Sequence, residues 1–230
     1  MWDRKELKAR GKAAFKANYW RCVGAAVILM ITAGAGGVAS GRAGGSNPEL
    51  VEQLKSMNPE HAFVVVAVVL GVIGFVMLVC TVLSIFVFRP LEVGGRRFFL
   101  ENSDEPAGMD ELTWGFRNDY MHTVGVMFVR DVYLLLWCCL LVVPGLVKSY
   151  AYRMVPYIVA EHPELSANEA ITLSRKMMNG HKMNSFILDL SFLGWIILSA
   201  LTAGLVGVFY YNPYLAATDA ELYKALRENV

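Results

Sequence analysis

The hydrophobic positions of this chain fall into long continuous runs. Residues 19–39 carry no charge after Arg21, and residues 62–88 form a longer run without any charge. Each run is at least as long as the roughly 20 residues that a helix needs to cross the hydrocarbon core of a membrane. Residues 124–143 and 185–201 are two further candidates, although both contain charged side chains. The pattern predicts an all-α, polytopic membrane protein.

A motif occurs twice, at the ends of two apolar stretches. Gly145-Leu-Val leads to Pro156-Tyr-Ile-Val-Ala, and Gly204-Leu-Val leads to Pro213-Tyr-Leu-Ala-Ala. Repetition of this kind is typical of chains assembled from one supersecondary unit. We expect helical hairpins that turn at Pro144-Gly145 and at Gly204, with a proline near the exit of each returning helix.

The repeat extends to the polar sequence on either side of the hairpins. An amphipathic stretch precedes each hairpin, and the third begins with Ser166-Ala-Asn-Glu169, a capping box that satisfies free backbone amides. Pro90 follows the first hairpin. We therefore expect one integral membrane domain of three units, residues 1–90, 108–160 and 166–222. Each unit consists of an interfacial helix, a hairpin and a proline exit.

The distribution of basic residues decides between four spans and six. If residues 146–160 and 205–217 also cross, sixteen Lys and Arg residues are cytoplasmic and only Arg42 and Lys55 are external. Four spans would place five further basic residues, between Lys148 and Met183, on the outside. Because basic residues favour the cytoplasmic side, we expect six transmembrane helices in three hairpins. Both termini are then cytoplasmic, in a multi-pass protein of the plasma membrane.

Composition supports the membrane interpretation and narrows the partners. The chain is 56% hydrophobic with a mean hydropathy of +0.43, whereas soluble domains are about 45–50% apolar. The net charge of +1 gives no reason to expect a nucleic-acid partner. The basic N-terminus followed by an apolar run also imitates a signal peptide, but we expect it to be a retained first span. Four cysteines in apolar segments are expected to pack between helices.

Several longer motifs carry a family resemblance. They include Arg89-Pro-Leu-Glu-Val-Gly94, Met154-Val-Pro-Tyr157, Asn212-Pro-Tyr214 and the stretch from Leu165 to Lys182. Together they resemble a bacterial integral membrane family catalogued as domain of unknown function nine-seven-five, over nearly the whole chain. The resemblance implies several membrane spans and supplies no reaction. More distantly, the pattern is similar to the membrane domain attached to some glycerophosphodiester phosphodiesterases, whose catalytic domain has no counterpart here.

Four charged residues lie within the predicted spans. Asp131 and Asp189 could serve an aspartyl protease or a proton relay, while Arg130 and Arg153 lie at a similar expected depth. A charge in hydrocarbon costs at least ~2.5 kcal/mol, so such groups are expected to face the bundle and pair. We favour an intramembrane charge network of structural importance.

Other catalytic chemistry has little support. The segment from Ser174 to His181 matches part of a lipid phosphate phosphatase signature but lacks its aspartate, with Ser185 in that place. The four histidines have no partner at metal-ligand spacing. We therefore expect no catalytic residue, metal or cofactor.

Two classes of function remain. The first is a non-enzymatic scaffold or regulatory membrane subunit, associated with anionic lipid and with an unidentified protein partner. The apolar face of the N-terminal helix would be Leu7, Ala14 and Phe15. Its lipid-facing basic residues would be Arg4, Lys5, Lys8, Lys12 and Lys16. The alternative is a small-solute or ion transporter or channel, suggested by repeated hairpins with proline breaks and buried charges.

Overall fold

The structure is a computed structural model that describes residues 2–34 and 58–228. All regular elements of these residues are helical. They are α1 (Arg4–Ala17), α2 (Tyr19–Gly34), α5 (Pro59–Leu83), a π-helical turn η1 (Ser84–Phe88), α6 (Arg89–Glu101), a 3-10 turn η2 (Met109–Thr113), α7 (Trp114–Arg117), α8 (Tyr120–Leu140), α9 (Val142–Ala151), α10 (Val155–Glu161), α11 (Ala167–Met177), α12 (Lys182–Leu190), α13 (Leu193–Leu201), a π-helical turn η3 (Gly207–Tyr211) and α14 (Asn212–Arg227). The predicted all-α class is confirmed for the part of the chain described.

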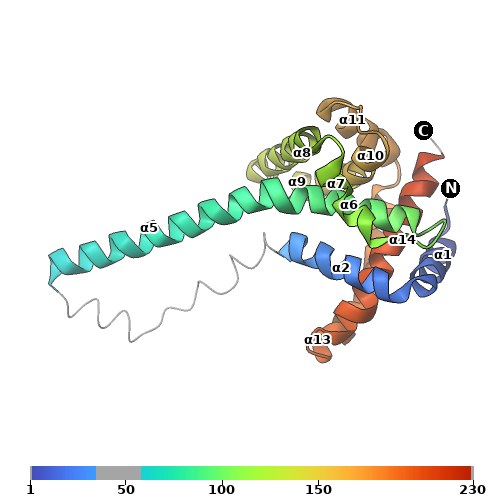
Figure 1. The fold of residues 1–230 in the computed structure, drawn as a ribbon, viewed down its shortest axis with the longest axis horizontal. Helices are drawn as coiled ribbons and strands as arrows, with labels where there is room; N and C mark the ends of the chain where they lie inside the picture. The colour runs from blue at the N-terminus through green and yellow to red at the C-terminus, as the bar shows by residue number, and fades with distance from the viewer. Residues whose placement is uncertain (1, 35–57, 229–230) are drawn as a thin grey trace.

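The three predicted proline breaks are the starts of the three helices at the centre of the molecule. Pro90 begins α6, Pro156 begins α10 and Pro213 begins α14, each in the first turn. Proline has no amide hydrogen to continue a helical ladder, but it fits the first turn of a new helix. The π-helical turns η1 and η3 precede α6 and α14, and a tight turn at residues 152–154 precedes α10. The helix continues through η1 from α5 into α6, which Figure 1 shows running on in nearly the same direction, and through η3 into α14, whereas the turn at residues 152–154 separates α9 from α10.

These three helices and the short amphipathic helices form a helical body with a buried core. The core includes Phe98 and Phe99 of α6, Tyr157 of α10 and Tyr223 of α14, each at most 1% exposed. The Tyr157 and Tyr223 rings stack with their centroids 5.0 Å apart. Figure 1 shows α6, α10 and α14 gathered with α1 and both ends of the described chain on one side of the molecule.

Helix α1 belongs to this body. Its residues Leu7, Gly11 and Phe15 recur every four positions and are buried, because they pack against α14. The approach is so close that a Cβ on Gly11 would lie 2.8 Å from the backbone nitrogen of Thr218. The apolar face expected to lie on lipid instead contacts protein.

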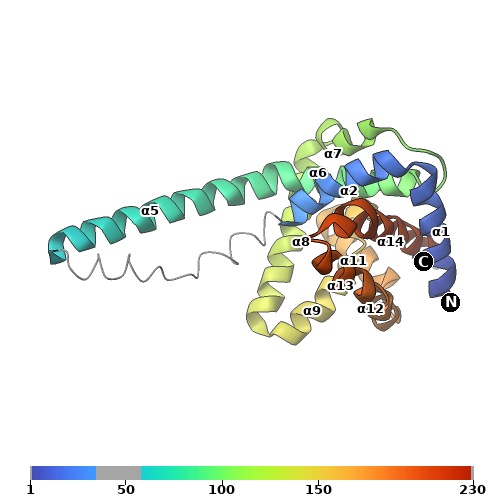
Figure 2. The same cartoon turned by 90° about the horizontal axis from the view of Figure 1, so that it is seen from below.

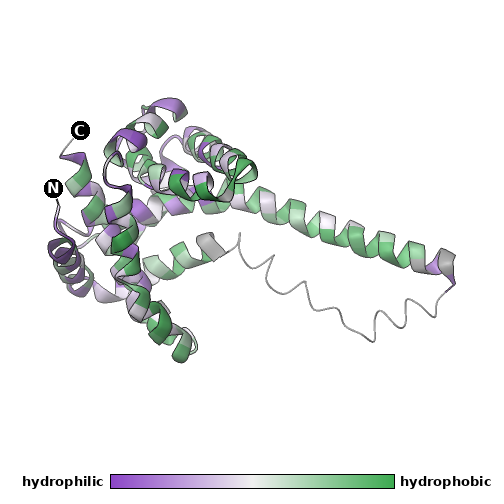
Figure 3. Cartoon of the chain, turned by 180° about the vertical axis from the view of Figure 1, so that it is seen from behind, coloured by the Kyte–Doolittle hydropathy of each residue, from purple (hydrophilic) through white to green (hydrophobic). Residues whose placement is uncertain are grey.

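The apolar hairpins project from the body. Helix α5 extends far to one side, and its side chains are exposed over its whole described length (Figures 1 and 3). The hairpin of α8 and α9 leaves the body in a different direction from α5 (Figure 2). Its turn is made by Leu141 in an extended conformation, and not by Pro144-Gly145 as the sequence predicts, because both of those residues lie within the first turns of α9. Gly145 packs where a Cβ would lie 2.7 Å from the Cys138 sulfur.

The third hairpin turns at residues 202–204, as the sequence predicts. Ala203 and Gly204 have φ angles of 50° and 89°, a left-handed conformation that glycine adopts without strain. The Gly204 amide donates to the Ser199 carbonyl at 2.8 Å, which closes the end of α13.

Three helical stretches of the described chain are long and apolar enough to cross a membrane: residues 63–101, 120–140 and 182–201. The described part of the first predicted span is shorter, at Tyr19–Thr32. Of the two stretches expected as single spans, residues 146–160 are interrupted by the turn at 152–154, whereas residues 205–217 are helical throughout, with the π-helical turn η3 before Pro213. Most of the predicted external loop, with Arg42 and Lys55, lies outside the described residues. Among the cysteines, only Cys22 is buried, whereas Cys80, Cys138 and Cys139 are exposed on the projecting helices.

Candidate functional site

Two clusters of paired charges lie where the hairpins meet the body. The first joins α6 to α8. Arg130 contacts Asp131 at 2.9 Å and Glu92 at 3.4 Å, and Arg89 contacts Asp131 at 2.6 Å and Glu92 at 2.8 Å. Two arginines and two carboxylates thus alternate, and the cluster carries no net charge.

The second cluster joins four elements around Arg153. This guanidinium donates to Asp189 of α12 at 2.8 and 2.9 Å and to Asp219 of α14 at 2.6 Å. Arg96 of α6 reaches Asp219 at 3.4 Å, and the Tyr150 hydroxyl donates to Asp189 at 2.9 Å. This cluster also contains two positive and two negative groups.

The clusters are largely shielded from solvent. The side chains of Arg130 and Asp219 are 8% and 7% exposed. A single unpaired charge in such surroundings is strongly destabilising, whereas a hydrogen-bonded pair offsets much of the desolvation cost. The arrangement therefore holds helices together, and each side chain has its charge neutralised by a neighbour.

The structure brings together the four predicted network residues, but in two separate clusters. Arg130 lies with Asp131, and Arg153 lies with Asp189. Sequence reasoning missed four partners: Arg89, Glu92, Arg96 and Asp219. A signal was present, since Arg89, Glu92 and Arg96 are spaced three and four residues apart and therefore share one face of α6.

The predicted helix cap of α11 is formed. Glu169 accepts a hydrogen bond from the Ser166 backbone amide at 2.9 Å and from its hydroxyl at 2.7 Å. These hydrogen bonds lower the pKa of Glu169 below its usual value. Along the same helix, Ala170, Ile171, Ser174 and Met177 are buried in the body, so this amphipathic face also packs on protein.

The basic residues of α1 do not form one uniform group. Arg4, Lys5, Lys12 and Lys16 are exposed to solvent. The Lys8 ammonium instead donates to the carbonyl and hydroxyl oxygens of Ser191 and lies 4.2 Å from the centre of the Phe192 ring. Lys8 is thus a contact between α1 and the α12–α13 junction, because its stem lies on the face turned toward the body.

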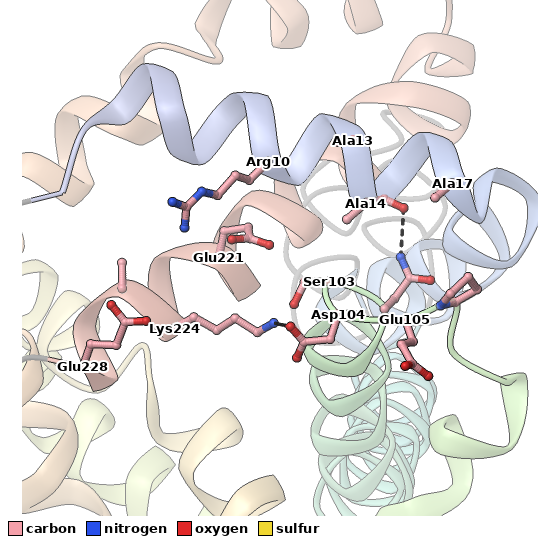
Figure 4. Close-up of a pocket in the computed structure, with 13 residues that line it drawn as sticks. Arg10, Ala13, Ala14, Ala17, Ser103, Asp104, Glu105, Glu221, Lys224 and Glu228 are labelled. Atoms are coloured by element: carbon pink, nitrogen blue, oxygen red, sulfur yellow. Dashed lines mark hydrogen bonds and ion pairs between the residues drawn. The ribbon is translucent and has the colours of Figure 1, made fainter.

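A surface cavity of about 560 Å³ lies between α1, α14 and the loop that follows α6 (Figure 4). Lys224 and Asp104 form an ion pair of 2.6 Å across it, and the Asn102 amide donates to the Ala14 carbonyl at 3.0 Å. Glu221 lines the same cavity, and burial raises the pKa of its carboxyl. Because side chains of both charge signs line the cavity, it defines no ligand by itself.

Catalytic and metal-binding groups are not assembled among the residues described. No group of three or more His, Cys, Asp or Glu side chains there could hold a metal ion. The Ser174 hydroxyl donates to the Ala151 carbonyl at 2.8 Å, and the His181 ring lies 6.2 Å from that of Trp2. The partial phosphatase motif is therefore used for packing in this structure.

The fold and its exposed apolar helices define an all-helical membrane protein. More particularly, the chain belongs to the family described as Protein of unknown function (DUF975), which it matches over residues 42–230. The family resemblance seen in the sequence is confirmed. No curated protein and no solved structure matches the chain, and the distant resemblance to phosphodiesterase membrane domains stays a prediction.

Proposed function

We propose that this protein is a non-enzymatic scaffold or regulatory subunit of the plasma membrane, associated with anionic lipid and with both termini in the cytoplasm. The pairing of charges at the bases of the hairpins carries the proposal. The single Arg153 side chain contacts both α12, through Asp189, and α14, through Asp219. Groups committed to such contacts are suited to fixing helices, rather than to moving protons or ions.

The proposed topology has three hairpins that enter from the cytoplasmic side. In the first, α5 is long enough to cross completely, since it has 25 residues, or roughly 37 Å of helix, against roughly 30 Å of hydrocarbon. The return leg of the second hairpin, α9, has only 10 residues, or roughly 15 Å. Helix α10 then packs on the charged helix α6, which belongs outside the hydrocarbon. The third hairpin likewise has a short return leg between Gly204 and Pro213.

We therefore propose that the second and third hairpins enter the cytoplasmic leaflet and turn back inside the membrane. Six complete passes, the arrangement that charge counting favours, are the alternative. Both arrangements keep the sixteen basic residues and both termini cytoplasmic. They differ in where the hairpin tips lie.

Cysteine labelling in intact cells separates these topologies. In a variant without the native cysteines, Leu141→Cys and Leu201→Cys report on the tips of the second and third hairpins, where both side chains are exposed. Re-entrant hairpins predict no reaction of either cysteine with an impermeant maleimide applied outside. Reaction of both from outside would support six passes. Leu165→Cys serves as the cytoplasmic control, and a cysteine within residues 46–57, outside the described part, as the external control.

Transport is the second candidate, and one observation favours it. A cavity of about 190 Å³ lies between α2, α6 and α14, and the Arg96–Asp219 pair lines it beside apolar residues such as Leu29 and Leu215. A charged pair next to a cavity within a helical bundle is a feature of transporters.

Purification from the native membrane after crosslinking, followed by mass spectrometry of proteins and lipids, tests the first proposal. A reproducible protein partner or retained anionic lipid supports a scaffold. A solute flux in reconstituted vesicles that Asp219→Asn abolishes, in a variant that remains folded, would instead establish transport.

A further inference from the structure

A third group of charged residues, separate from the two paired clusters, lies where α9, α11 and α12 meet. Lys148 of α9, Arg175 and Lys176 of α11, and Lys182 at the start of α12 line a cavity of about 340 Å³ together with Asn179. We call these five residues the basic pocket. It collects four cations from three helices, although they are up to 34 positions apart in the sequence.

The basic pocket lacks the anions that neutralise other basic side chains. Within the described chain, none of its four cations has a carboxylate oxygen within 4.0 Å, whereas Arg89, Arg97, Arg130 and Arg153 each contact at least two carboxylates. Arg175, Lys182 and Lys148 line the same cavity, so their like charges repel one another, and the Lys148 ammonium lies 4.4 Å from the centre of the Trp137 ring rather than on an anion. A bound anion would relieve this repulsion.

Local structure fixes the positions of these cations. The buried Ser174 hydroxyl donates to the Ala151 carbonyl at 2.8 Å and so holds α11 against the end of α9. Gly180, with a φ of 78°, reverses the chain after α11 and returns Lys182 to the same cavity. The capped start of α11 limits its movement from the other end. The backbone positions that carry the four cations are therefore set within the fold.

The surroundings of the basic pocket are those of a membrane surface. Leu146 and Val147 on α9 and Met183 and Phe186 on α12 are exposed apolar side chains, between 47% and 67% exposed. Leu146 and Val147 precede Lys148 on α9, and Met183 and Phe186 follow Lys182 on α12, while the other two cations of the pocket lie on α11. A lipid could place its phosphate among the cations and its acyl chains along these apolar residues.

We propose that the basic pocket binds the phosphate group of an anionic lipid of the cytoplasmic leaflet. Arginine can bind phosphate through two parallel N–H groups, and lysine contributes point charges. Basic pockets between membrane helices on the cytoplasmic side are suited to such headgroups. The inference rests on the proposed membrane association and gives it a defined lipid site. It also places the end of α9, where Lys148 lies, at the headgroups of the cytoplasmic leaflet.

The test uses the full-length protein in nanodiscs of phosphatidylcholine with a minority of phosphatidylglycerol, with lipid retention measured by native mass spectrometry. Arg175→Gln combined with Lys182→Gln is expected to weaken retention of phosphatidylglycerol on the order of tenfold or more. Arg175→Lys keeps the charge and is expected to retain most of it. The matched control, Arg4→Gln with Lys5→Gln, removes the same charge from the exposed surface of α1 and is expected to weaken retention less than the pocket variant does, because those side chains do not converge on one cavity.

Each outcome bears on a separate claim. Unchanged retention in the pocket variant overturns the site, and loss in the α1 control alone would move lipid binding to α1 while leaving membrane association intact. No retained anionic lipid in the wild type would contradict the proposed function as well. Inorganic phosphate, added at millimolar concentration to the protein in detergent, identifies the source of the anion. If it binds the wild type as tightly as the lipid does and the pocket variant does not bind it, the ligand is a soluble anion and the lipid assignment is wrong.

Discussion

Arg153 and Asp219 form an ion pair of 2.6 Å that joins the end of the second hairpin to the buried face of α14. The same guanidinium contacts Asp189 of α12 at 2.8 Å. One side chain thus connects the exits of the second and third hairpins to the start of the third. Because Asp219 is also within 3.4 Å of Arg96, the contact extends to the helix that follows the first hairpin.

Removing one carboxylate of this cluster should destabilise the protein according to how deeply the group is buried. Asp219 is 7% exposed, so Asp219→Asn should lower the free energy of unfolding by about 3–5 kcal/mol, because the substitution leaves the partner arginines without this carboxylate in a buried site. Asp189 is 32% exposed, so Asp189→Asn should cost less. Unfolding of the purified protein in detergent, monitored by circular dichroism, measures both.

A second substitution identifies the partner of Asp189. Arg153→Gln should partly restore stability to the Asp189→Asn variant, because it removes the arginine left with one carboxylate. Arg130→Gln should not, since Arg130 contacts Asp131 and Glu92 in the other cluster. Equal rescue by both substitutions would contradict the separation of the two clusters. An unchanged stability of Asp189→Asn, together with loss of a proton-coupled flux in vesicles, would support a relay instead.

Gly11 is predicted to be intolerant of any side chain. A Cβ at this position would lie 2.8 Å from the Thr218 backbone nitrogen, so Gly11→Ala should force α1 away from α14. The expected loss is about 1–3 kcal/mol, typical of overpacking. Gly125→Ala is the control, because nothing lies within 4 Å of its added Cβ and alanine favours a helix. An equal effect of both substitutions on the unfolding midpoint would argue against close packing of α1.

Phe15 separates the protein-facing and lipid-facing interpretations of α1. It is 1% exposed in the core, so Phe15→Ala should lower the unfolding free energy by about 3–5 kcal/mol. Phe116→Ala, at a site 38% exposed, is the control and should cost much less. If Phe15→Ala leaves stability unchanged but weakens binding to anionic vesicles, the apolar face of α1 lies on lipid after all.

Glu221 should give the stability a pH dependence. Burial raises the pKa of this carboxyl, partly offset by Lys224 and Arg10, so the folded protein holds the proton more tightly than the unfolded chain. This contribution to stability is complete below the ordinary Glu pKa of about 4.3 and is lost as pH rises through the raised pKa. In Glu221→Gln the neutral amide does not titrate, so this pH dependence disappears. At neutral pH the wild-type carboxyl is buried in its unfavourable charged form, so the unfolding midpoint of the variant there should rise on the order of 1–2 °C. Glu228→Gln, on the exposed rim of the same cavity, is the control. A matching change in both variants would exclude Glu221 as the source of the pH dependence.

The sequence by itself determined the helical class, the family and the breaks between elements. Long uncharged runs exclude other secondary structure in a membrane, because only helices satisfy every backbone group within one segment. Pro90, Pro156 and Pro213 lack the amide hydrogen that a regular α-helix needs, so the departures from regular α-helix at η1, at residues 152–154 and at η3 follow from local chemistry. The cap at Ser166 and Glu169 and the turn at Gly204 are local for the same reason.

Only the tertiary structure decided which faces meet and which charges pair. The amphipathic pattern of α1 is compatible with packing on lipid or on protein. The close approach of Gly11 to Thr218 shows that its apolar face packs on protein. Asp219 lies in a polar stretch that reads as a surface helix, yet it is buried because α14 returns between α1 and α6. Lys148 and Lys182 are 34 positions apart, and only the short α9 and the turn at Gly180 bring them to one cavity. Pairing and depth depend on distances between segments, which no periodicity along the chain specifies.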